Sequence, residues 1–524
     1  MSGAVVIVVQ DNGASAALSV PQPNTQLVVG CAVGGTVNQP FATTQPQSLQ
    51  NQFIGGPLVE AGGLSCQNGA VVVAVSCPIV TKGTAYPVQA SVPNGSSSPV
   101  TVQVDGTNGA WDTYYVLIKP TVAGTVGTSG IVVQVSLDAG RNFGPPQALP
   151  LSGVLVLGAP YSPPTVGGTG VQVTFGAGTV KLGDSWQFGT VAPQWNGAGV
   201  AAAIAAFQAS QYGVAGVGSI HVVGDAMHGG SGTSDIATIQ TQLQAGVAIF
   251  EYDRAIVSLR DALAPTAWGG SGETEAAWMV SLAAATSGLT AQPRICADGP
   301  YYNSPSPYGN SAGGSPAYRR PLAWSHAVRR TQIGLQRRAG RVKDGPYSTI
   351  AVNPTSDPAD GFVYHDERVT PGLAAARVGS AQTFPKKGAG FFQSSPGPGM
   401  YGEPLLSAPG SQFVELPIGN VLDAACDIGY ATGVEEVSDD LTTQANGTLD
   451  PVDLNTFQGD IQVALNEGML QISPALASAA TATVSPTANV GATGIIPVTI
   501  SVRKKAYADQ ISETINLVNG GGST

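Results

Sequence analysis

The sequence predicts a mixed α/β (α+β) core that is interrupted by an inserted all-β domain and flanked by extended terminal strand arms. Helical and strand patterns alternate after residue 193, short alternating apolar runs fill residues 84–193, and an apolar strand pattern lies near each end of the chain. Alternating helices and strands are typical of layers around one sheet, whereas many short strands between turns are typical of a sandwich or barrel.

The 524 residues are long enough for several domains. We expect six segments in all. They are an N-terminal arm at 1–26, a first part of the core at 27–83, the inserted β-rich outer domain at 84–193, a second part of the α/β core at 194–400, a helical part at 401–494, and C-terminal strands with an arm at 495–524.

The elements expected after residue 193 follow from periodicity and turn signals. They are a helix at 200–212, a strand at 219–223, a helix from Ser234 to about residue 244, a strand at 247–252, a helix at 273–286, a Pro-Gly-initiated helix containing Arg377, and a helix at 417–432.

The end of the chain carries the clearest pattern. Apolar residues recur at helical spacing from Asp453, the expected N-cap, to Leu470. The segment 496–502 then alternates as a strand with one buried face, and 511–518 repeats that alternation after a basic turn. We expect the Ser/Ala/Thr/Pro-rich spacer at 473–494 to act as a hinge.

The first strand pattern, at residues 4–9, is an unbroken apolar run. Such a strand exposes an unpaired edge unless something covers it. It is either paired with the terminal strand of another subunit or an ordinary first strand of the local sheet. The residues expected in inter-subunit arms are Val5, Val6, Ile7, Val8, Val9, Ile511, Ile515, Leu517 and Val518.

Composition favours a chain that buries much of its exterior against copies of itself. Only 10% of residues are charged, while Gly numbers 69 and Pro 38. A secreted β-rich protein has a similar composition. The net charge of −11 argues against direct binding of nucleic acid.

Basic residues concentrate in the segment 319–343, and acidic residues gather at 435–453. Both segments are either solvated surfaces or complementary interfaces between subunits. The candidate charged interface consists of Arg329, Arg330, Arg337, Arg338, Arg503, Lys504 and Lys505.

No apolar run reaches the roughly 20 residues that a membrane helix needs, so we expect no membrane insertion. The first residues carry no basic leader or long apolar segment, which predicts assembly in a cytoplasm. The five cysteines form no C-x-x-C motif, so we interpret them as buried free thiols. The alternative is cross-linking between subunits through Cys31, Cys66, Cys77, Cys296 or Cys426.

No constellation of residues predicts catalysis, a metal or a cofactor. The Gly309–Gly313 match to G-x-S-x-G lies in a Pro/Ser/Gly loop without the strand and helix that a nucleophile elbow needs. No Gly-Lys-Ser/Thr follows any glycine-rich run. His221, Asp225 and His228 do not fit a known metal-ligand spacing, and we expect the four histidines to be structural.

Two stretches of the chain's end, "ALNEGMLQISP" and "ATGIIPVTISVRKKAYADQISETINLVN", resemble the C-terminal region of contractile tail sheath proteins of myovirus-type bacteriophages. The phrases "VSLDAGRNF" and "LGDSWQFGTVAP" resemble the β-rich insertion of one branch of that family. The resemblance is firm only after about residue 453.

The resemblance implies a non-enzymatic structural subunit that polymerises around a tail tube by inter-subunit strand exchange. It also implies contraction that drives the tube through the host envelope. The implied partners are the chain itself, the tail tube protein, and baseplate and tail terminator proteins. The implied location is the virion tail, after assembly in the host cytoplasm. The alternative is a secreted or surface β-rich adhesin or a virion decoration protein.

Overall fold

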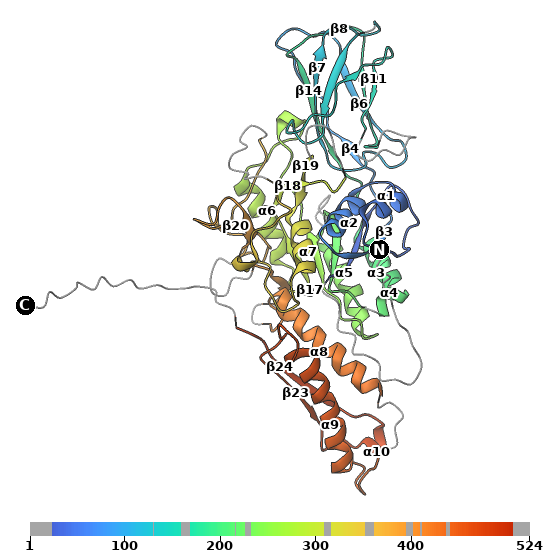
Figure 1. The fold of residues 1–524 in the computed structure, drawn as a ribbon, viewed down its shortest axis with the longest axis vertical. Coiled ribbons are helices and arrows are strands. Elements are labelled where there is room, and N and C mark those ends of the chain that lie inside the picture. The colour runs from blue at the N-terminus through green and yellow to red at the C-terminus, as the bar shows by residue number, and fades with distance from the viewer. Residues whose placement is uncertain are drawn as a thin grey trace, which may run out of the picture.

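In the computed structural model of the chain, a seven-stranded sheet lies at the centre of the molecule, in the strand order β2-β3-β1-β15-β16-β17-β22 (Figure 1). The inner strands from β3 to β17 are parallel, and β2 and β22 join antiparallel at the two edges. The strands are β1 (Thr25–Cys31), β2 (Phe41–Thr43), β3 (Val71–Cys77), β15 (Ser219–Asp225), β16 (Ala255–Ser258), β17 (Ala291–Asp298) and β22 (Leu405–Ser407). The structure describes residues 24–128, 130–158, 168–214, 216–225, 232–308, 316–351, 361–394, 402–408, 411–435 and 441–506.

Helices cover both faces of this sheet, which is why its parallel strands are apolar along almost their whole length. Leu27 and Val29 of β1 pack toward one face with the helices α3, α5 and α6, while Val28 packs toward the other with α2 and α7. The helices around the central sheet are α1 (Pro46–Phe53), α2 (Pro57–Gln67), α3 (Gly197–Gln208), α4 (Gln211–Val214), α5 (Gly232–Val247), α6 (Glu275–Ser287) and α7 (Leu322–Gln332). The predicted mixed α/β core is confirmed.

A β-rich part stands at one end of the elongated molecule, above the sheet in Figure 1. Its sheets have the orders β10-β9-β7-β14-β4, with β5 also paired to β14, and β11-β12-β6 and β13-β8. The strands are β4 (Thr84–Ala85), β5 (Gln89–Ser91), β6 (Val100–Val104), β7 (Tyr115–Val122), β8 (Gly124–Thr125), β9 (Val132–Ser136), β10 (Gln147–Ala148), β11 (Val154–Val156), β12 (Val171–Phe175), β13 (Thr179–Val180) and β14 (Ser185–Val191).

The chain enters and leaves this β-rich part at neighbouring points. Thr81 and Gln194 form an antiparallel bridge, and the Val80 N–H donates to the Gln194 carbonyl at 2.8 Å. The exact limits of an inserted outer domain at 84 and 193 stay a prediction.

Short elements join the sheet to the β-rich part and flank it. They are β18 (Tyr301–Pro305), β19 (Ala317–Pro321), β20 (Ala381–Thr383) and β21 (Phe391–Gln393), with 3-10 turns at Thr266–Trp268 and Val342–Asp344. β18 pairs with β19, and β20 with β21.

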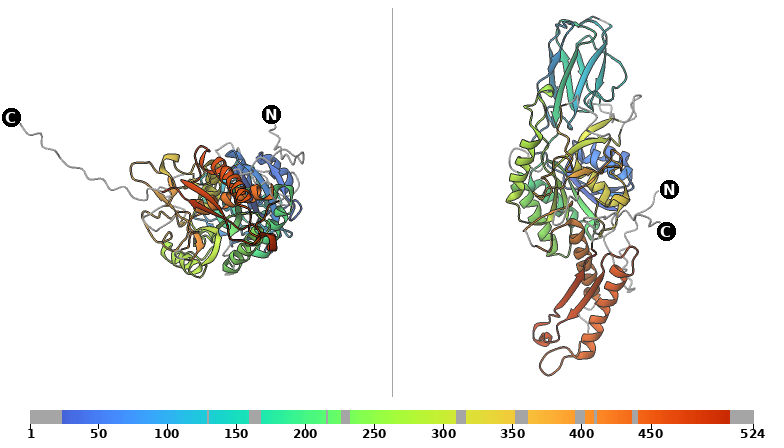
Figure 2. Two further views of the ribbon diagram at one scale, coloured as in Figure 1. Left: turned by 90° about the horizontal axis from the view of Figure 1, so that it is seen from below. Right: turned by 90° about the vertical axis from the view of Figure 1, so that its left-hand side faces the viewer.

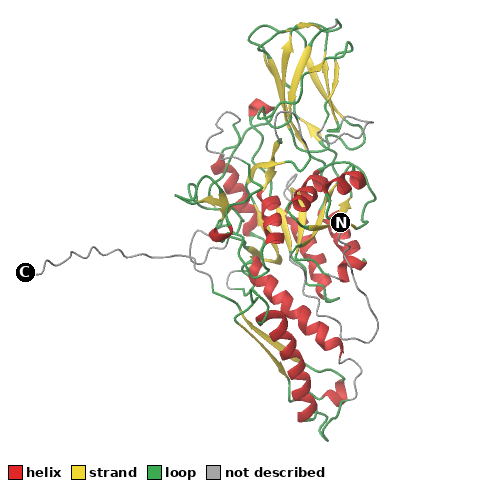
Figure 3. Cartoon of the chain, in the orientation of Figure 1, coloured by secondary structure: helices red, strands yellow, loops and turns green. Residues whose placement is uncertain are grey.

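The opposite end of the molecule is built from the C-terminal elements (Figures 1 and 2). They are α8 (Leu416–Glu435), α9 (Pro451–Leu465), a π-helical turn at Asn466–Leu470, β23 (Ala479–Val484), α10 (Val490–Thr493) and β24 (Val498–Arg503). β23 and β24 form an antiparallel two-stranded sheet, here called the terminal ribbon, which lies along α8 and α9 (Figure 3). The predicted helix near 453–470 and the strand at 496–502 are confirmed within a few residues.

Several local expectations are wrong. α9 is capped by Asp450, whose carboxylate accepts from the Val452 N–H at 2.9 Å, while the Asp453 carboxylate accepts from the Thr442 N–H. The spacer at 473–494 contains β23 and α10, so it is not a hinge along its length. In β23 the buried face consists of Ala480, Ala482 and Val484, and the two threonines between them are exposed.

The expected strand at 247–252 is instead the end of α5 and the turn after it, and the buried strand begins later, at Ala255. The apolar residues of the segment 247–252 suggest a buried strand, but Ile249 and Phe250 are exposed to solvent. The expected helix around Arg377 is a series of turns. Arg377 has a positive φ of 60°, and its guanidinium donates to the carbonyl oxygens of Leu289, Ser407 and Thr286.

Candidate inter-subunit surfaces

The terminal ribbon has one inner and one outer face. Val498, Ile500 and Val502 of β24 pack toward α8 and α9, and the residues between them are exposed. In β23, Ala480, Ala482 and Val484 are buried in the same apolar cluster. The sequence predicts that β24 has one buried and one exposed face, and this prediction is confirmed.

The outer edge of β23 is closed by two glutamine side chains of α9. Gln462 accepts from the Ala482 N–H at 3.0 Å and donates to the Ala480 carbonyl at 3.0 Å, and Gln458 accepts from the Val484 N–H at 3.0 Å. These side chains form hydrogen bonds with the backbone N–H and C=O groups to which a further strand would have to bind. No strand can pair with this edge unless the glutamines move.

The outer edge of β24 has no such cover in the described part of the chain. The register pairs Ala480, Ala482 and Val484 with Val502, Ile500 and Val498. In an antiparallel pair, two residues that lie opposite each other direct their backbone groups either toward each other or both away. Ala480, Ala482 and Val484 direct theirs away from β24, toward the glutamines. Their partners Val498, Ile500 and Val502 therefore direct their N–H and C=O groups away from β23, to the outer edge of β24. No hydrogen bond to them occurs among the described residues. β24 therefore presents an edge that can accept one more strand.

The predicted arms that would supply such a strand lie outside the described residues. These are Val5, Val6, Ile7, Val8, Val9, Ile511, Ile515, Leu517 and Val518. The basic segment between β24 and the second arm is described: Arg503 and Lys504 are exposed, and Lys505 is half-buried. The Ser478 hydroxyl donates to the carbonyl oxygens of Arg503 and Lys504, which holds the start of this segment beside β23.

Two arginines of the candidate charged interface do not reach the surface. Arg329 is 7% exposed and donates to the carbonyl oxygens of Asp344 and Gly345. Arg330 is 2% exposed and donates to the Leu335 carbonyl. The prediction is wrong for these two residues, because the chain after α7 folds back over the helix and its carbonyl groups bind both guanidinium groups.

The next two arginines differ from each other. The side chain of Arg338 is 12% exposed and lies 2.7 Å from the fully buried carboxylate of Glu415. Arg337 is 32% exposed and lies 3.4 Å from Asp344. Of the four arginines near α7 in the candidate charged interface, Arg337 is therefore the most accessible for contact with another subunit.

Four of the five cysteines are buried, and Cys426 on α8 is exposed. Cys31 and Cys77 lie opposite each other on the parallel strands β1 and β3. Burial raises the pKa of Cys66 to about 12 and raises the pKa values of Cys77 and Cys296 well above the usual range, so all three stay protonated. The geometry leaves Cys426 as the candidate cross-linking thiol.

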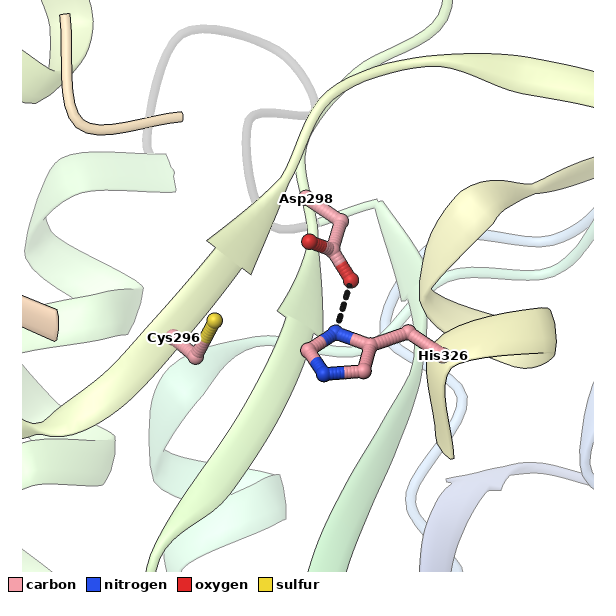
Figure 4. Close-up of side chains that lie close together, drawn as sticks. All are labelled: Cys296, Asp298 and His326. Atoms are coloured by element: carbon pink, nitrogen blue, oxygen red, sulfur yellow. Dashed lines mark hydrogen bonds and ion pairs between the residues drawn. The ribbon is translucent and has the colours of Figure 1, made fainter. Parts of the chain in front are cut away.

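His326 lies in the interior between two buried carboxylates. Its Nδ1 is 2.8 Å from Asp298 and its Nε2 is 2.9 Å from Glu403, and the Cys296 thiol lies nearby (Figure 4). Although burial opposes the charged form, these two carboxylates raise the pKa of His326 to about 9. Both ring nitrogens already bind carboxylates, so a metal ion would have to displace one of these bonds.

The other histidines differ in their surroundings. His365 contacts Glu275 at 2.9 Å and Glu367 at 2.8 Å. His221 is buried, and neither ring nitrogen has a hydrogen-bond partner among the described residues. Burial, and to a smaller extent the charge of His326, lowers the pKa of His221 to about 3. His228 and the Gly309–Gly313 motif lie outside the described residues.

A cavity of about 340 Å³ lies at the carboxyl ends of β15 and β16, between the sheet and the β-rich part. Its arginines are paired within the chain: Arg319 contacts Asp261 at 2.6 Å, and Arg320 contacts Glu60 at 2.5 Å. Arg320 also contacts Asp112 of the β-rich part at 3.2 Å, so together these ion pairs hold the β-rich part and β19 to the core. No sequence motif marks this cavity, because its lining comes from segments far apart in the chain.

Among the described residues, no helix combines the length and apolar character needed to cross a bilayer.

No family model and no curated protein matches the sequence. The structure matches a sheath tail protein of Listeria innocua at 10% identity and a TM-score of 0.41, over 92% of this chain and 94% of that one. A sheath tail protein of Desulfitobacterium hafniense matches at 10% identity and a TM-score of 0.41, over 95% of this chain and 100% of that one. The contracted sheath complex of an extracellular contractile injection system matches at 10% identity and a TM-score of 0.34, over 53% of this chain and 68% of that one. These solved structures are sheath proteins, the class that the sequence resembles.

Proposed function

We propose that the chain is the structural subunit of a contractile tail sheath, and that its copies are joined by strand exchange at β24. One observation carries the proposal: among the described residues, the terminal ribbon has one edge closed by Gln458 and Gln462 and the other edge open. A ribbon with one closed and one open edge accepts one strand at a defined place, which suits an ordered polymer better than random aggregation.

The donated strand comes from the arm patterns at 4–9 or 511–518 of a neighbouring copy. Residues 511–518 alternate as a strand and follow β24 after a short basic segment, and residues 4–9 form an unbroken apolar run of strand-forming residues. The side chains of Val498, Ile500 and Val502 already face their own helices, so the added strand pairs through backbone groups.

Each backbone hydrogen bond stabilises such a junction by only about 0.5 to 1.5 kcal/mol net. The junction is therefore weak in an isolated pair of subunits. Repetition around a ring and along a tube converts these weak junctions into a stable polymer, since neighbouring junctions hold each strand at high effective concentration.

In this mechanism the arms keep neighbouring subunits connected while the bodies repack. The inner tube, the baseplate and the tail terminator are the implied partners, and contraction drives the tube through a host envelope. The β-rich part lies at the end of the molecule opposite the terminal ribbon, which supports a position outside the contacts that build the polymer.

Electron microscopy of purified full-length protein tests the proposal. We expect hollow striated tubes from the full chain, and folded monomers after deletion of residues 1–9 or 507–524. Circular dichroism and gel filtration check that the truncated proteins remain folded. Long tubes formed by both truncated proteins would overturn the strand-exchange mechanism.

A further inference from the structure

An exposed aromatic pair joins the end of α5 to α8. The rings of Phe250 and Tyr430 are stacked with centroids 3.8 Å apart and planes inclined by 12°. Both residues remain open to solvent, with exposed fractions of 46% and 41%. Ile249 and Val434 beside them are 59% and 48% exposed. These four residues form what we call the aromatic patch.

Phe250 has a backbone conformation that normally requires glycine. Its φ is 65°, in the left-handed region, where a bulky side chain is an outlier. The Phe250 N–H donates to the Val247 carbonyl and the Glu251 N–H donates to the Gly246 carbonyl, the two bonds that end a helix in a Schellman motif. Glycine at this position removes the strain. A solvent-exposed phenylalanine there contributes little burial in the isolated chain, which points to a contact outside it.

Carboxyl groups rim the patch. Burial raises the pKa of Glu251 to about 7 and that of Asp427 to about 8, so neither is fully ionised at neutral pH until a cation approaches. Glu251 follows Phe250 directly, and Asp427 lies one turn before Tyr430 on the same stripe of α8. Glu435 at the end of α8 is exposed beside Val434. Exposed aromatic faces with an acidic rim suit a cationic partner, because a guanidinium or ammonium group binds both the ring face and the carboxylates.

The chain carries a matching cationic segment. Arg503 and Lys504 are exposed at the end of β24, and neither side chain has an ion-pair partner in the described part of the molecule. This segment follows β24, which lies along one side of α8. On that side the Ile500 side chain packs against Gly429 of α8. Tyr430 is the next residue of the helix and points about 100° further around it. The patch and the basic segment therefore lie on different sides of α8.

We infer that the aromatic patch is covered, in the assembled polymer, by the basic segment Arg503–Lys505 of a second copy of this chain. The two surfaces are different, so the contact is head-to-tail and repeats along an open filament or ring. The inference rests on the proposed function, because it assigns a contact within that polymer. It also gives the exposed Phe250 a role that the isolated chain does not explain.

Two pairs of variants test the inference, with the critical concentration for tube formation measured by sedimentation and electron microscopy. Phe250→Gly keeps the turn and removes the ring. We expect its melting temperature to stay within about 3 °C of the parent protein, while the critical concentration rises about tenfold or more. Leu151→Ala, at a 61% exposed residue of the β-rich part, is the control and should change neither quantity.

Charge exchange identifies the partner. Glu435→Lys and Lys504→Glu should each raise the critical concentration several-fold, and the double variant should return it toward the parent value. Tubes from the parent protein and unchanged assembly of both Phe250→Gly and Lys504→Glu would overturn the inference while the proposed function stands. Weakened single variants without recovery in the double variant would show that Lys504 binds elsewhere. Absence of any polymer from the parent protein would remove the proposed function and this contact together.

Discussion

The side-chain amide of Gln462 lies against the backbone of Ala482 and accepts its N–H at 3.0 Å. This single relationship closes one edge of the terminal ribbon. It also makes the ribbon asymmetric, since β24 has no equivalent cover among the described residues.

Replacement of Gln462 should destabilise the ribbon and open its second edge. Gln462→Leu keeps the size of the side chain but leaves the Ala482 N–H and the Ala480 carbonyl without partners, which costs about 1 to 3 kcal/mol. Urea denaturation measures this loss, and light scattering should detect irregular aggregates. Gln471→Leu, at an exposed glutamine, is the matched control. Equal stability of the two variants would contradict the role given to Gln462.

Proline substitutions should distinguish the two edges of β24. Val502→Pro removes an N–H that points to the open edge, so the monomer should fold while tube formation is lost. Ser501→Pro removes an N–H directed to β23 and should disrupt the ribbon itself. Hydrogen exchange of 479–503 reports on the ribbon, and electron microscopy reports on assembly. Tubes formed by the Val502→Pro protein would show that β24 accepts no strand.

Arg338 and Arg337 should have unequal effects on stability. Arg338→Met leaves the buried Glu415 carboxylate without its ion pair and should cost about 2 to 4 kcal/mol. Arg337→Met removes a partly exposed pair and should stay within about 1 kcal/mol. Chemical denaturation at neutral pH measures both. Charge reversal at Arg337 then tests a salt-dependent contact between subunits without the folding defect expected at Arg338.

His326 should make the stability of the core depend on pH. Its pKa is raised from 6.5 to about 9 in the folded protein, so its contribution is complete below about pH 6.5 and is lost as the pH rises through about 9. The unfolding free energy of the parent protein should therefore fall relative to that of His326→Gln over this window. Only the difference between the two proteins isolates His326, because several buried carboxyl groups also titrate. Parallel curves would contradict the charged state assigned to His326.

Thiol labelling should single out Cys426. In the native protein a maleimide reagent should modify Cys426 and spare the four buried cysteines, and Cys426→Ser should abolish the reaction. Burial and the neighbouring Asp423 raise the pKa of Cys426, so labelling should accelerate at pH values above the usual thiol range. Mass spectrometry of the labelled peptides identifies the modified residue. Rapid modification of Cys31 or Cys77 would show that the sheet opens.

The sequence predicts elements whose periodicity is continuous. The helix α9 and the strand β24 have apolar residues at regular spacing, and both are found where expected. β23 is missed because Ala and Thr at 479–484 carry no strong apolar alternation. The strand expected at 247–252 is misplaced because the end of α5 and the strand β16 form two nearby apolar runs, and only tertiary packing separates them.

The surfaces are harder to predict than the elements. Arg329 and Arg330 look like a solvated basic cluster in the sequence, and their burial follows from a later segment that folds over α7. Gln458 and Gln462 have the spacing of an ordinary polar helix face, so nothing in the sequence marks them as the cover of a strand edge. Phe250 is not marked either, because the sequence predicts a strand at 247–252 and the position after the helix becomes apparent only from the true end of α5 at Val247.

The bridge between Thr81 and Gln194 gives the molecule a practical property. Two backbone segments leave the α/β layer and return to it side by side, about 5 Å apart. A foreign protein whose own termini are adjacent fits between these points in place of the strands β4 to β14, while the terminal ribbon at the far end stays untouched. The chain thus offers a graft site for cargo at the end of the molecule opposite the terminal ribbon.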